Sequence, residues 1–327
     1  MKKLIVFIVS ILAMLGLFTG CAPEMPNDVK LEIATTTGDV GGSYEERIRS
    51  LYQAGFKNVD LSLYDLSTGD VLMEENWKDT TDSLKTLANE LGMTFVQAHL
   101  PKHNPFFNSY YYDFSVRIAI RAIEVCGELG IKEAVIHFGY ANYFTKEQAF
   151  EKNKQFINDL LPTAVEYGVN ILCENSTVKN MGSTYYPNSG ADMLEFIEYV
   201  DHPNLHACWD TGHGNLEEGS QYDDIVALGD HLRAIHFNDN AGDRDTHLMP
   251  YYGSMNVKDV MRALNVIDFK GYFTLESTGG TRANGTYKGP QFSDVTDYNP
   301  TDRLEQEKLL YKITERILID YDMLKVA

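Results

Sequence analysis

The amino-acid sequence predicts a single (β/α)8 barrel, and three observations support this prediction. Eight short apolar runs alternate with segments in which apolar residues recur at helical spacing. The runs start at residues 31, 58, 94, 133, 170, 205, 232 and 271, so successive starts lie 27 to 39 residues apart, the length of one βα unit. Most runs are almost continuously apolar, as expected for parallel strands that are buried on both faces.

The predicted strands are residues 31–36, 58–63, 94–99, 133–138, 170–174, 205–209, 232–237 and 271–276. The predicted helices are residues 44–54, 84–91, 114–129, 146–167, 191–200, 257–266 and 302–324, with a short helix near 222–228. Four of these helices are followed by a glycine that can adopt the left-handed conformation of a helix C-terminus: Gly55, Gly92, Gly130 and Gly168. The alternative is an open doubly wound sheet, but the loop at 36–43 lacks the G-x-G-x-x-G spacing of that fold.

The N-terminal segment has the pattern of an export signal rather than of a barrel element. Lys2 and Lys3 precede an apolar stretch at 4–17, which is too short for a comfortable membrane span. Leu-Phe-Thr-Gly-Cys at 17–21 resembles the lipobox of bacterial lipoproteins, which implies a lipid on Cys21. The alternative is a plain secretory signal with an incidental cysteine. We therefore predict a signal peptide at 1–20, a lipidated cysteine and tether at 21–30, and a single barrel domain at 31–327, in a membrane-anchored extracytoplasmic lipoprotein.

The charge argues against a nucleic-acid partner. The chain carries 28 Lys and Arg against 47 Asp and Glu, a formal net charge of −19, and a surface this acidic repels a phosphate backbone.

Besides Cys21 there are three cysteines, Cys126, Cys173 and Cys208, each in an apolar context. We interpret these as small buried hydrophobic residues. A disulfide between Cys173 and Cys208 stays open, because they lie on neighbouring predicted strands.

Histidine and carboxylate side chains gather at the C-terminal ends of the predicted strands, where barrel enzymes place their catalytic groups. Five of the nine histidines and four carboxylates lie there: His99, His137, His213, His236 and His247, with Glu174, Asp210, Asp245 and Glu276. Imidazole and carboxylate ligands converging on one mouth indicate a divalent cation. The set suits Mn, Zn, Co or Mg and leaves the number of ions open between one and three. Asp39 and Asp60, at the first two predicted strands, can shape the floor of the mouth or support the ligands from behind, and they are assigned no chemical role.

The order of these residues resembles the xylose isomerase-like TIM-barrel superfamily, which includes sugar phosphate isomerase/epimerase-type proteins, ketose 3-epimerases and endonuclease IV. The resemblance covers most of residues 31–325. Its most specific pieces are Asp-Thr-Gly-His at 210–213 and His-Phe-Asn-Asp-Asn at 236–240. It implies one divalent ion bound by Glu174, Asp210, His236 and Glu276. It also implies that His213 and Arg244 orient the substrate, although Arg244 has the alternative of a surface ion pair with Asp243 or Asp245.

The endonuclease IV branch implies a larger ligand set for up to three ions. The residues that match this set are His99, His137, His213, Asp245 and His247. The match leaves the number of metal ions open, because sugar-isomerase-like members of the superfamily also keep part of the set.

We therefore expect a metal-dependent sugar isomerase or epimerase that transfers a proton beside a carbonyl. One of Glu174 and Glu276 would remove the α-proton and the other would return it, while the metal ion acts as a Lewis acid. The alternatives are a metal-dependent phosphodiesterase of the endonuclease IV type and a non-catalytic sugar-binding lipoprotein. Export favours a free carbohydrate over a sugar phosphate as the substrate. The sequence does not predict the oligomeric state, and the segment 278–300 is either a lid or an insertion without function.

Overall fold

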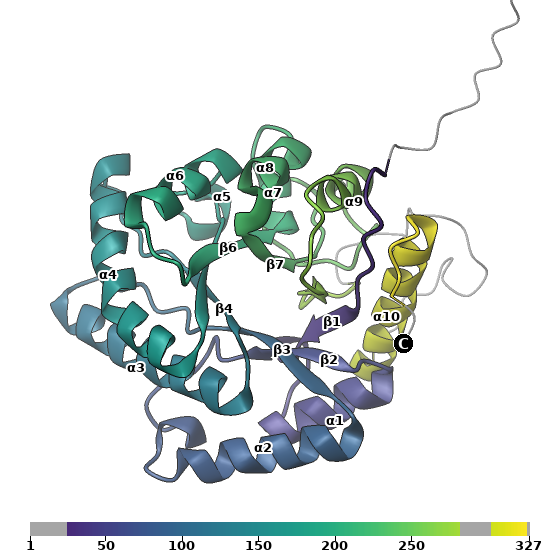
Figure 1. The fold of residues 1–327 in the computed structure, drawn as a ribbon, viewed down its shortest axis with the longest axis horizontal. Helices are drawn as coiled ribbons and strands as arrows, with labels where there is room; N and C mark the ends of the chain where they lie inside the picture. Colours follow the sequence, from purple (N-terminus) through teal and green to yellow (C-terminus); the bar gives the residue numbers. More distant parts are fainter. Residues whose placement is uncertain (1–24, 282–301, 326–327) are drawn as a thin grey trace, which may run out of the picture.

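The structure, a computed structural model, describes residues 25–281 and 302–325. Its eight strands form one sheet, which helices surround (Figure 1). All the strand pairs are parallel, and neighbouring strands follow the order β7-β6-β5-β4-β3-β2-β1-β8. The sheet closes between β7 and β8, where Phe237 N donates to Thr274 O at 2.8 Å and Glu276 N donates to Phe237 O at 3.2 Å. The predicted (β/α)8 barrel is confirmed. The strands are β1 Ile33–Thr36, β2 Asn58–Ser62, β3 Thr94–His99, β4 Glu133–His137, β5 Asn170–Glu174, β6 Leu205–Asp210, β7 Leu232–His236 and β8 Phe273–Leu275.

The helices form the outer layer of the barrel (Figure 1). Their bounds are α1 Tyr44–Ala54, α2 Trp77–Leu91, α3 Ser109–Leu129, α4 Lys146–Tyr167, α5 Val178–Met181, α6 Gly190–Val200, α7 Thr211–Leu216, α8 Gln221–Leu228, α9 Val257–Val266 and α10 Arg303–Asp320. Short 3-10 turns lie at Thr37–Asp39, Val71–Met73 and Gly229–His231. The four predicted glycines follow α1 to α4 in the left-handed conformation. Ser43 and Thr145 form capping boxes at the starts of α1 and α4.

The sequence prediction differs from the structure mainly at helix starts and in loops. Helix α2 begins at Trp77 rather than at residue 84, and α3 begins at Ser109 rather than at 114. The first two turns of α2 are largely polar, and the first turn of α3 contains three consecutive tyrosines, of which Tyr110 and Tyr111 are exposed, so neither start shows apolar residues at helical spacing. The prediction also missed α5 and α7, which have four and six residues and are too short to show a helical period.

The three described cysteines are buried and free, which confirms their interpretation as small hydrophobic residues. Cys173 packs in the large hydrophobic cluster, whereas Cys208 belongs to a separate small cluster with Val135, Leu172 and Ala234. Adjacent residues of a strand face opposite sides, and β5 and β6 pair Cys173 with Ala207. The two thiols therefore face different layers, and the disulfide left open between Cys173 and Cys208 is not formed.

The predictions for the N-terminal segment and for residues 278–300 fall largely outside the described residues. The signal peptide, Cys21 and residues 282–300 of the 278–300 segment lie there, and these stay predictions. The described part of the tether already contacts the barrel, because Asn27 exchanges hydrogen bonds with Asn265 and Val29 is buried. Within residues 25–281 and 302–325, no helix is both long and apolar enough to cross a membrane.

Candidate metal and active site

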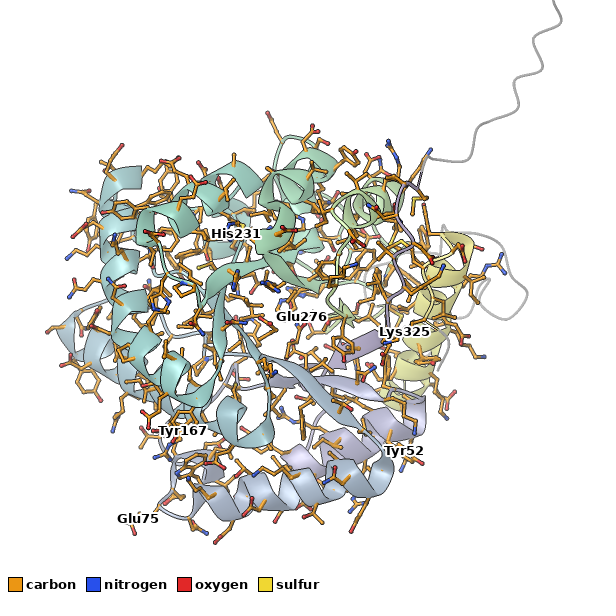
Figure 2. The ribbon with its side chains drawn as sticks, viewed as in Figure 1. Tyr52, Glu75, Tyr167, His231, Glu276 and Lys325 are labelled. Carbon is orange, nitrogen blue, oxygen red and sulfur yellow. The ribbon has the colours of Figure 1, made fainter. Side chains whose placement is uncertain are left out.

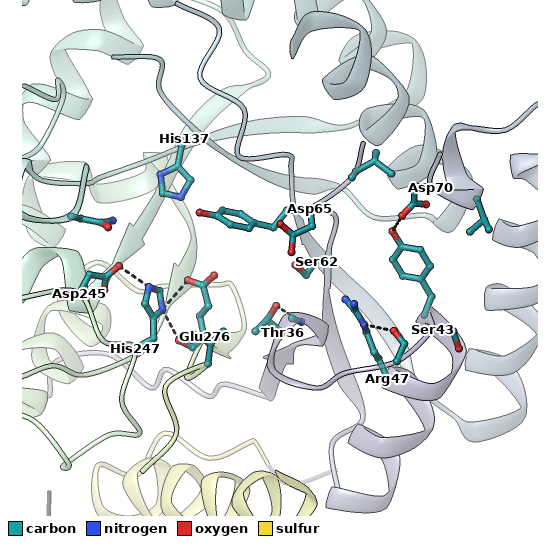
Figure 3. Close-up of a pocket in the computed structure, with 18 of the residues that line it drawn as sticks. Thr36, Ser43, Arg47, Ser62, Asp65, Asp70, His137, Asp245, His247 and Glu276 are labelled. Atoms are coloured by element: carbon teal, nitrogen blue, oxygen red, sulfur yellow. Dashed lines mark hydrogen bonds and ion pairs between the residues drawn. The ribbon is translucent and has the colours of Figure 1, made fainter. Parts of the chain in front are cut away.

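A cavity of about 660 Å³ opens at the C-terminal mouth of the barrel. His137, His213, Asp245, His247 and Glu276 line one side of it, as Figure 3 shows for four of them. The opposite wall comes from the loops that follow β1 and β2, where the Tyr44 hydroxyl donates to Asp70 Oδ2 at 3.2 Å. Figure 2 places Glu276 near the centre of the barrel, whereas Glu75 and Tyr52 lie at its periphery. The mouth is therefore a polar cavity with candidate ligands on one wall.

Four predicted ligands form what we call the inner group: Glu174, Asp210, His236 and Glu276. The first three are the last residues of β5, β6 and β7, and Glu276 directly follows β8. One ligand atom from each lies within 4.8 Å of the others. His236 Nδ1 lies 3.1 Å from Glu174 Oε1 and 3.3 Å from Glu276 Oε2. Barrel closure thus brings four strand ends from separate parts of the chain to one point.

Two further groups adjoin the inner group, and a third set, His99, His236 and Glu276, overlaps both the inner group and the first of them. His99 and His137 form a side group with Glu174, and the Nε2 atom of each lies 3.2 Å from Glu174 Oε2. His213, Asp245 and His247 form a rim group, in which Asp245 Oδ2 lies 3.3 Å from His213 Nε2 and 2.9 Å from His247 Nε2. The structure therefore brings together all nine residues that the sequence proposed as metal ligands.

The spacing Asp210-x-x-His213 follows from a helix cap. Asp210 ends β6 and caps α7, accepting a hydrogen bond from His213 N through Oδ1 at 2.6 Å. Its other oxygen accepts from Asn238 Nδ2 at 2.6 Å. Gly212 lies so close to Asn238 that an added Cβ would be 1.9 Å from Asn238 Oδ1. The two most specific sequence stretches are thus one interlocked structure.

Three of the histidines are held by backbone carbonyls. The Nδ1 atoms of His99, His213 and His247 lie 2.7, 2.8 and 2.9 Å from the carbonyl oxygens of Leu100, Asn175 and Glu276. A carbonyl oxygen only accepts hydrogen bonds, so the Nδ1 atom that faces it must carry a proton. When a cation is bound, the Nε2 atom of each ring is therefore unprotonated and faces the ligand group. His247 also has φ of 42°, a left-handed conformation that residues with a Cβ rarely adopt. Strain of this kind is found where the surrounding structure holds a functional side chain in place.

The charges interact strongly in this cavity. Burial alone would raise the pKa of Glu174, but His137 and His236 hold it well below its usual range. Burial raises the pKa of Asp210 to about 6 and lowers the pKa of His137 to about 3. Burial would lower the pKa of His213, yet Asp210 and Asp245 raise it to about 9. Such opposed shifts are typical of functional sites.

The donor set fits a divalent cation. Glu174 Oε2 is buried and has no hydrogen-bond partner among the described residues, although two imidazole nitrogens face it at 3.2 Å. Nitrogen and oxygen lone pairs that converge without hydrogen-bond geometry are what a metal ion between them requires. All the candidate ligands among the described residues are imidazole or carboxylate groups. A set of imidazole and carboxylate ligands without thiolates suits Zn, Mn or Co better than it suits a metal that requires thiolate ligands.

Some site residues were predicted differently or missed. Arg244 is exposed and does not line the cavity. Asp60, which received no chemical role, is fully buried on β2, and its Oδ2 lies 3.3 Å from His236 Nε2. A carboxylate inside an apolar strand is costly unless it is paired, and this signal could have identified it. Tyr64 was missed as well. Its ring lies edge-on to the His99 ring, with 4.9 Å between the ring centroids, and Tyr64 lines the cavity.

Known proteins share this fold and parts of this sequence. The family described as "Xylose isomerase-like TIM barrel" matches residues 48–294. The chain is 28% identical to a ketose 3-epimerase of Arthrobacter globiformis over 162 residues, which are 48% of this chain and 53% of that protein. It is 30% identical to a probable endonuclease 4 of Mesomycoplasma hyopneumoniae over 135 residues, 39% of this chain and 47% of that protein. The chain spans about half the length of the curated relatives it matches.

A solved structure shows the likeness over nearly the whole fold. D-psicose 3-epimerase from Clostridium cellulolyticum H10, solved with D-tagatose, superposes with a TM-score of 0.69 at 17% identity. The superposition covers 88% of this chain and 99% of that chain. At this level of identity the match supports the fold alone.

Proposed function

Because the chain belongs to the xylose isomerase-like TIM barrel family, we propose that it is a divalent-metal-dependent sugar isomerase or epimerase. The observation that carries the proposal is the inner group, in which the Glu276 carboxylate lines the cavity beside three buried ligands. Relatives named as ketose 3-epimerases support the same chemical class. The proposed cofactor is one divalent ion in the inner group, with up to two more in the side and rim groups.

Glu276 is the better placed of the two proposed bases. Its side chain is 15% exposed and faces the cavity, and its Oε2 lies near His236 Nδ1 and, at 3.7 Å, His247 Nδ1. A bound divalent ion would supply Lewis-acid polarisation of the substrate carbonyl, which acidifies the adjacent C–H bond. Glu276 would then accept the α-proton, since general bases act from within hydrogen-bond reach of the proton that they remove.

Glu174 is proposed to return the proton to the opposite face or to the adjacent carbon. It is fully buried beneath the cavity wall, and both of its oxygens face histidines. The geometry therefore supports its role as a shared ligand more directly than its role in proton transfer. His213, on α7, lines the cavity and is proposed to orient a substrate hydroxyl. Arg244 is proposed to do the same from its exposed position in the loop between β7 and α9.

The proposed substrate is a free carbohydrate rather than a nucleic acid. The cavity is of the size that binds small molecules, and the chain has a formal net charge of −19.

The proposed lipid anchor on Cys21 would place the enzyme outside the cytoplasm, attached to a membrane. Mass spectrometry of the protein purified from the membrane fraction should show a mature chain that begins at Cys21 and carries a lipid there. A mature chain without a lipid on Cys21 would contradict the anchor.

Solvent-deuterium incorporation into a panel of ketoses tests the catalytic proposal. The metal-loaded protein should incorporate deuterium beside the carbonyl, and Glu276→Gln should lower the exchange rate by roughly 10²–10⁴-fold, the usual contribution of an acid–base group. Glu75→Gln is the matched control, because Glu75 is exposed at the periphery of the molecule. Unchanged exchange in Glu276→Gln would contradict the proposal. Sugar binding without exchange in the wild-type protein would favour a non-catalytic carbohydrate receptor.

A metal-dependent phosphodiesterase is the second candidate, and the three adjoining groups favour it. Multi-metal sites are well suited to phosphoester hydrolysis, because the ions activate water and stabilise the leaving oxygen. The partial match to a probable endonuclease 4 supports this candidate, whereas the acidic net charge opposes it. Cleavage of an oligonucleotide that contains an abasic site, with no exchange in any ketose, would establish this function instead.

A further inference from the structure

Below the inner group, four buried side chains from four different strands form a line of hydrogen bonds. Thr274 Oγ1 donates to Gln97 Oε1 at 2.9 Å, and Gln97 Nε2 donates to Asp60 Oδ2 at 2.7 Å. The same Asp60 oxygen lies 3.3 Å from His236 Nε2. These residues belong to β8, β3, β2 and β7, and each is at most 2% exposed. The line therefore runs through the barrel interior and ends on a proposed metal ligand.

The donors in this line fix its direction. Thr274 donates to the oxygen of the Gln97 amide, which turns the amide nitrogen toward Asp60. Asp60 Oδ2 thereby acts as an acceptor, so the His236 Nε2 that faces it carries a proton. The other ring nitrogen, Nδ1, is left for the inner group, where it faces Glu174 and Glu276.

His236 differs in this respect from the other oriented histidines. His99, His213 and His247 use Nδ1 to contact backbone carbonyls and present Nε2. His236 presents Nδ1, and its Nε2 faces a carboxylate side chain. A substitution at position 60 should therefore act on one candidate ligand, His236, because the backbone carbonyls that hold the other three rings stay in place.

We propose that Asp60 is a positioning residue, supported by Gln97 and Thr274, that fixes the ring and the tautomer of His236 and so sets the affinity of the inner group for its ion. The proposal rests on the proposed metal-dependent function. A carboxylate behind a metal-bound histidine fixes the ring orientation and makes the ligand nitrogen more basic. The negative charge of the carboxylate also attracts the ion through the low-dielectric interior of the barrel.

Metal titration of the purified full chain without any sugar tests this proposal. Mn²⁺ and Zn²⁺ are titrated separately into wild-type protein and into Asp60→Asn, in competition with a chelating dye that reports the free ion. The Asp60→Asn substitution keeps the shape of the side chain but removes its charge. Loss of such an outer partner typically weakens metal binding by roughly 10–100-fold, and we expect this loss at the inner group only. Thr35→Val is the matched control, because Thr35 is a buried strand residue whose Oγ1 has no hydrogen-bond partner among the described residues.

Gln97→Met tests the next member of the line. It removes the amide but keeps the length of the side chain, so the expected loss of affinity is smaller than in Asp60→Asn. A second readout is the nitrogen spectrum of zinc-loaded protein labelled with ¹⁵N-histidine. Wild-type His236, assigned by its absence in His236→Gln, should show the form protonated at Nε2, and Asp60→Asn should change the shift of that nitrogen.

The outcomes separate this proposal from the proposed function. Unchanged affinity of Asp60→Asn for both ions, or a His236 ring protonated at Nδ1 in the zinc-loaded wild-type protein, would overturn the role of Asp60 and leave the metal-dependent function standing. An equal loss at the rim group would show general damage to the barrel and would also overturn it. A wild-type protein that binds neither ion would refute the proposed function itself.

Discussion

The inner group and the rim group use the same kinds of ligand but differ in how the fold holds them. Glu174, Asp210 and His236 end three barrel strands and are fully buried. Asp245 and His247 lie in the loop between β7 and α9, with side chains 13% and 19% exposed. Groups on strands are held more precisely than groups on loops. We therefore expect the inner group to bind its ion more tightly and to carry the chemistry.

The largest expected effect comes from Glu174, which belongs to both the inner and the side groups. Glu174→Gln should remove two of the three candidate ion sites and reduce deuterium exchange by at least about 10³-fold, since it removes a ligand and a proposed proton-transfer group together. Metal content per protein measured by mass spectrometry, with Glu75→Gln as the control, checks this. A metal content equal to that of the wild-type protein would show that Glu174 is not a shared ligand.

The interlocked turn behind Asp210 offers a structural test of the inner group. Gly212→Ala would place a Cβ 1.9 Å from Asn238 Oδ1, so the turn must shift. We expect a loss of unfolding free energy of about 1–3 kcal/mol and weaker binding at the inner group, because overpacking displaces neighbouring side chains. Chemical denaturation of metal-free protein measures the first effect. Gly41→Ala, where an added Cβ meets nothing within 4 Å, is the control.

A buried carboxylate away from the histidines provides a reference for the inner group. Glu307 is buried beside Arg303, 2.7 Å away, and burial raises its pKa to about 7, opposite in direction to Glu174. A pKa raised on folding means that this residue stabilises the fold fully below about pH 4.5 and loses that contribution as the pH rises through 7. Glu307→Gln should therefore be more stable than the wild type at pH 8, by on the order of 1 kcal/mol, but not at pH 5. Equal differences at both pH values in thermal unfolding would contradict the shifted pKa.

The smallest effect is expected at the rim group. His247→Gln should remove one ion but change ketose exchange by less than about tenfold, because the proposed proton transfer uses the inner group alone. Exchange rate and metal content measured on the same sample check this. If the rim substitution abolished activity while the inner ion remained bound, the two groups would act as a unit, as the phosphodiesterase candidate requires.

Much of the fold and the ligand set was predictable because both depend on local patterns. Apolar runs mark the strands, and a histidine or carboxylate at the end of such a run marks the mouth. Helices α1, α4 and α9 have the predicted bounds, since their apolar spacing spans the whole helix. The nine candidate ligands meet because closure of the barrel brings the strand ends together.

The contacts between side chains of different strands could not be predicted. Asp60 and Gln97 are 37 residues apart, and their hydrogen bond depends on the register of β2 with β3, which includes a bulge after Val59. The role of Asn238 in holding Asp210 depends likewise on the pairing of β6 with β7. The short helix α7 was missed because its start is set by the Asp210 cap and not by an apolar period.

X-ray diffraction from crystals soaked in Mn²⁺ or Zn²⁺, collected at the absorption edge of the metal, shows which side chains bind the ion. We expect the strongest anomalous peak among Glu174, Asp210, His236 and Glu276, with weaker peaks in the side or rim groups. A strongest peak at His213, Asp245 and His247, or no peak within the inner group, would contradict the proposed role of the inner group.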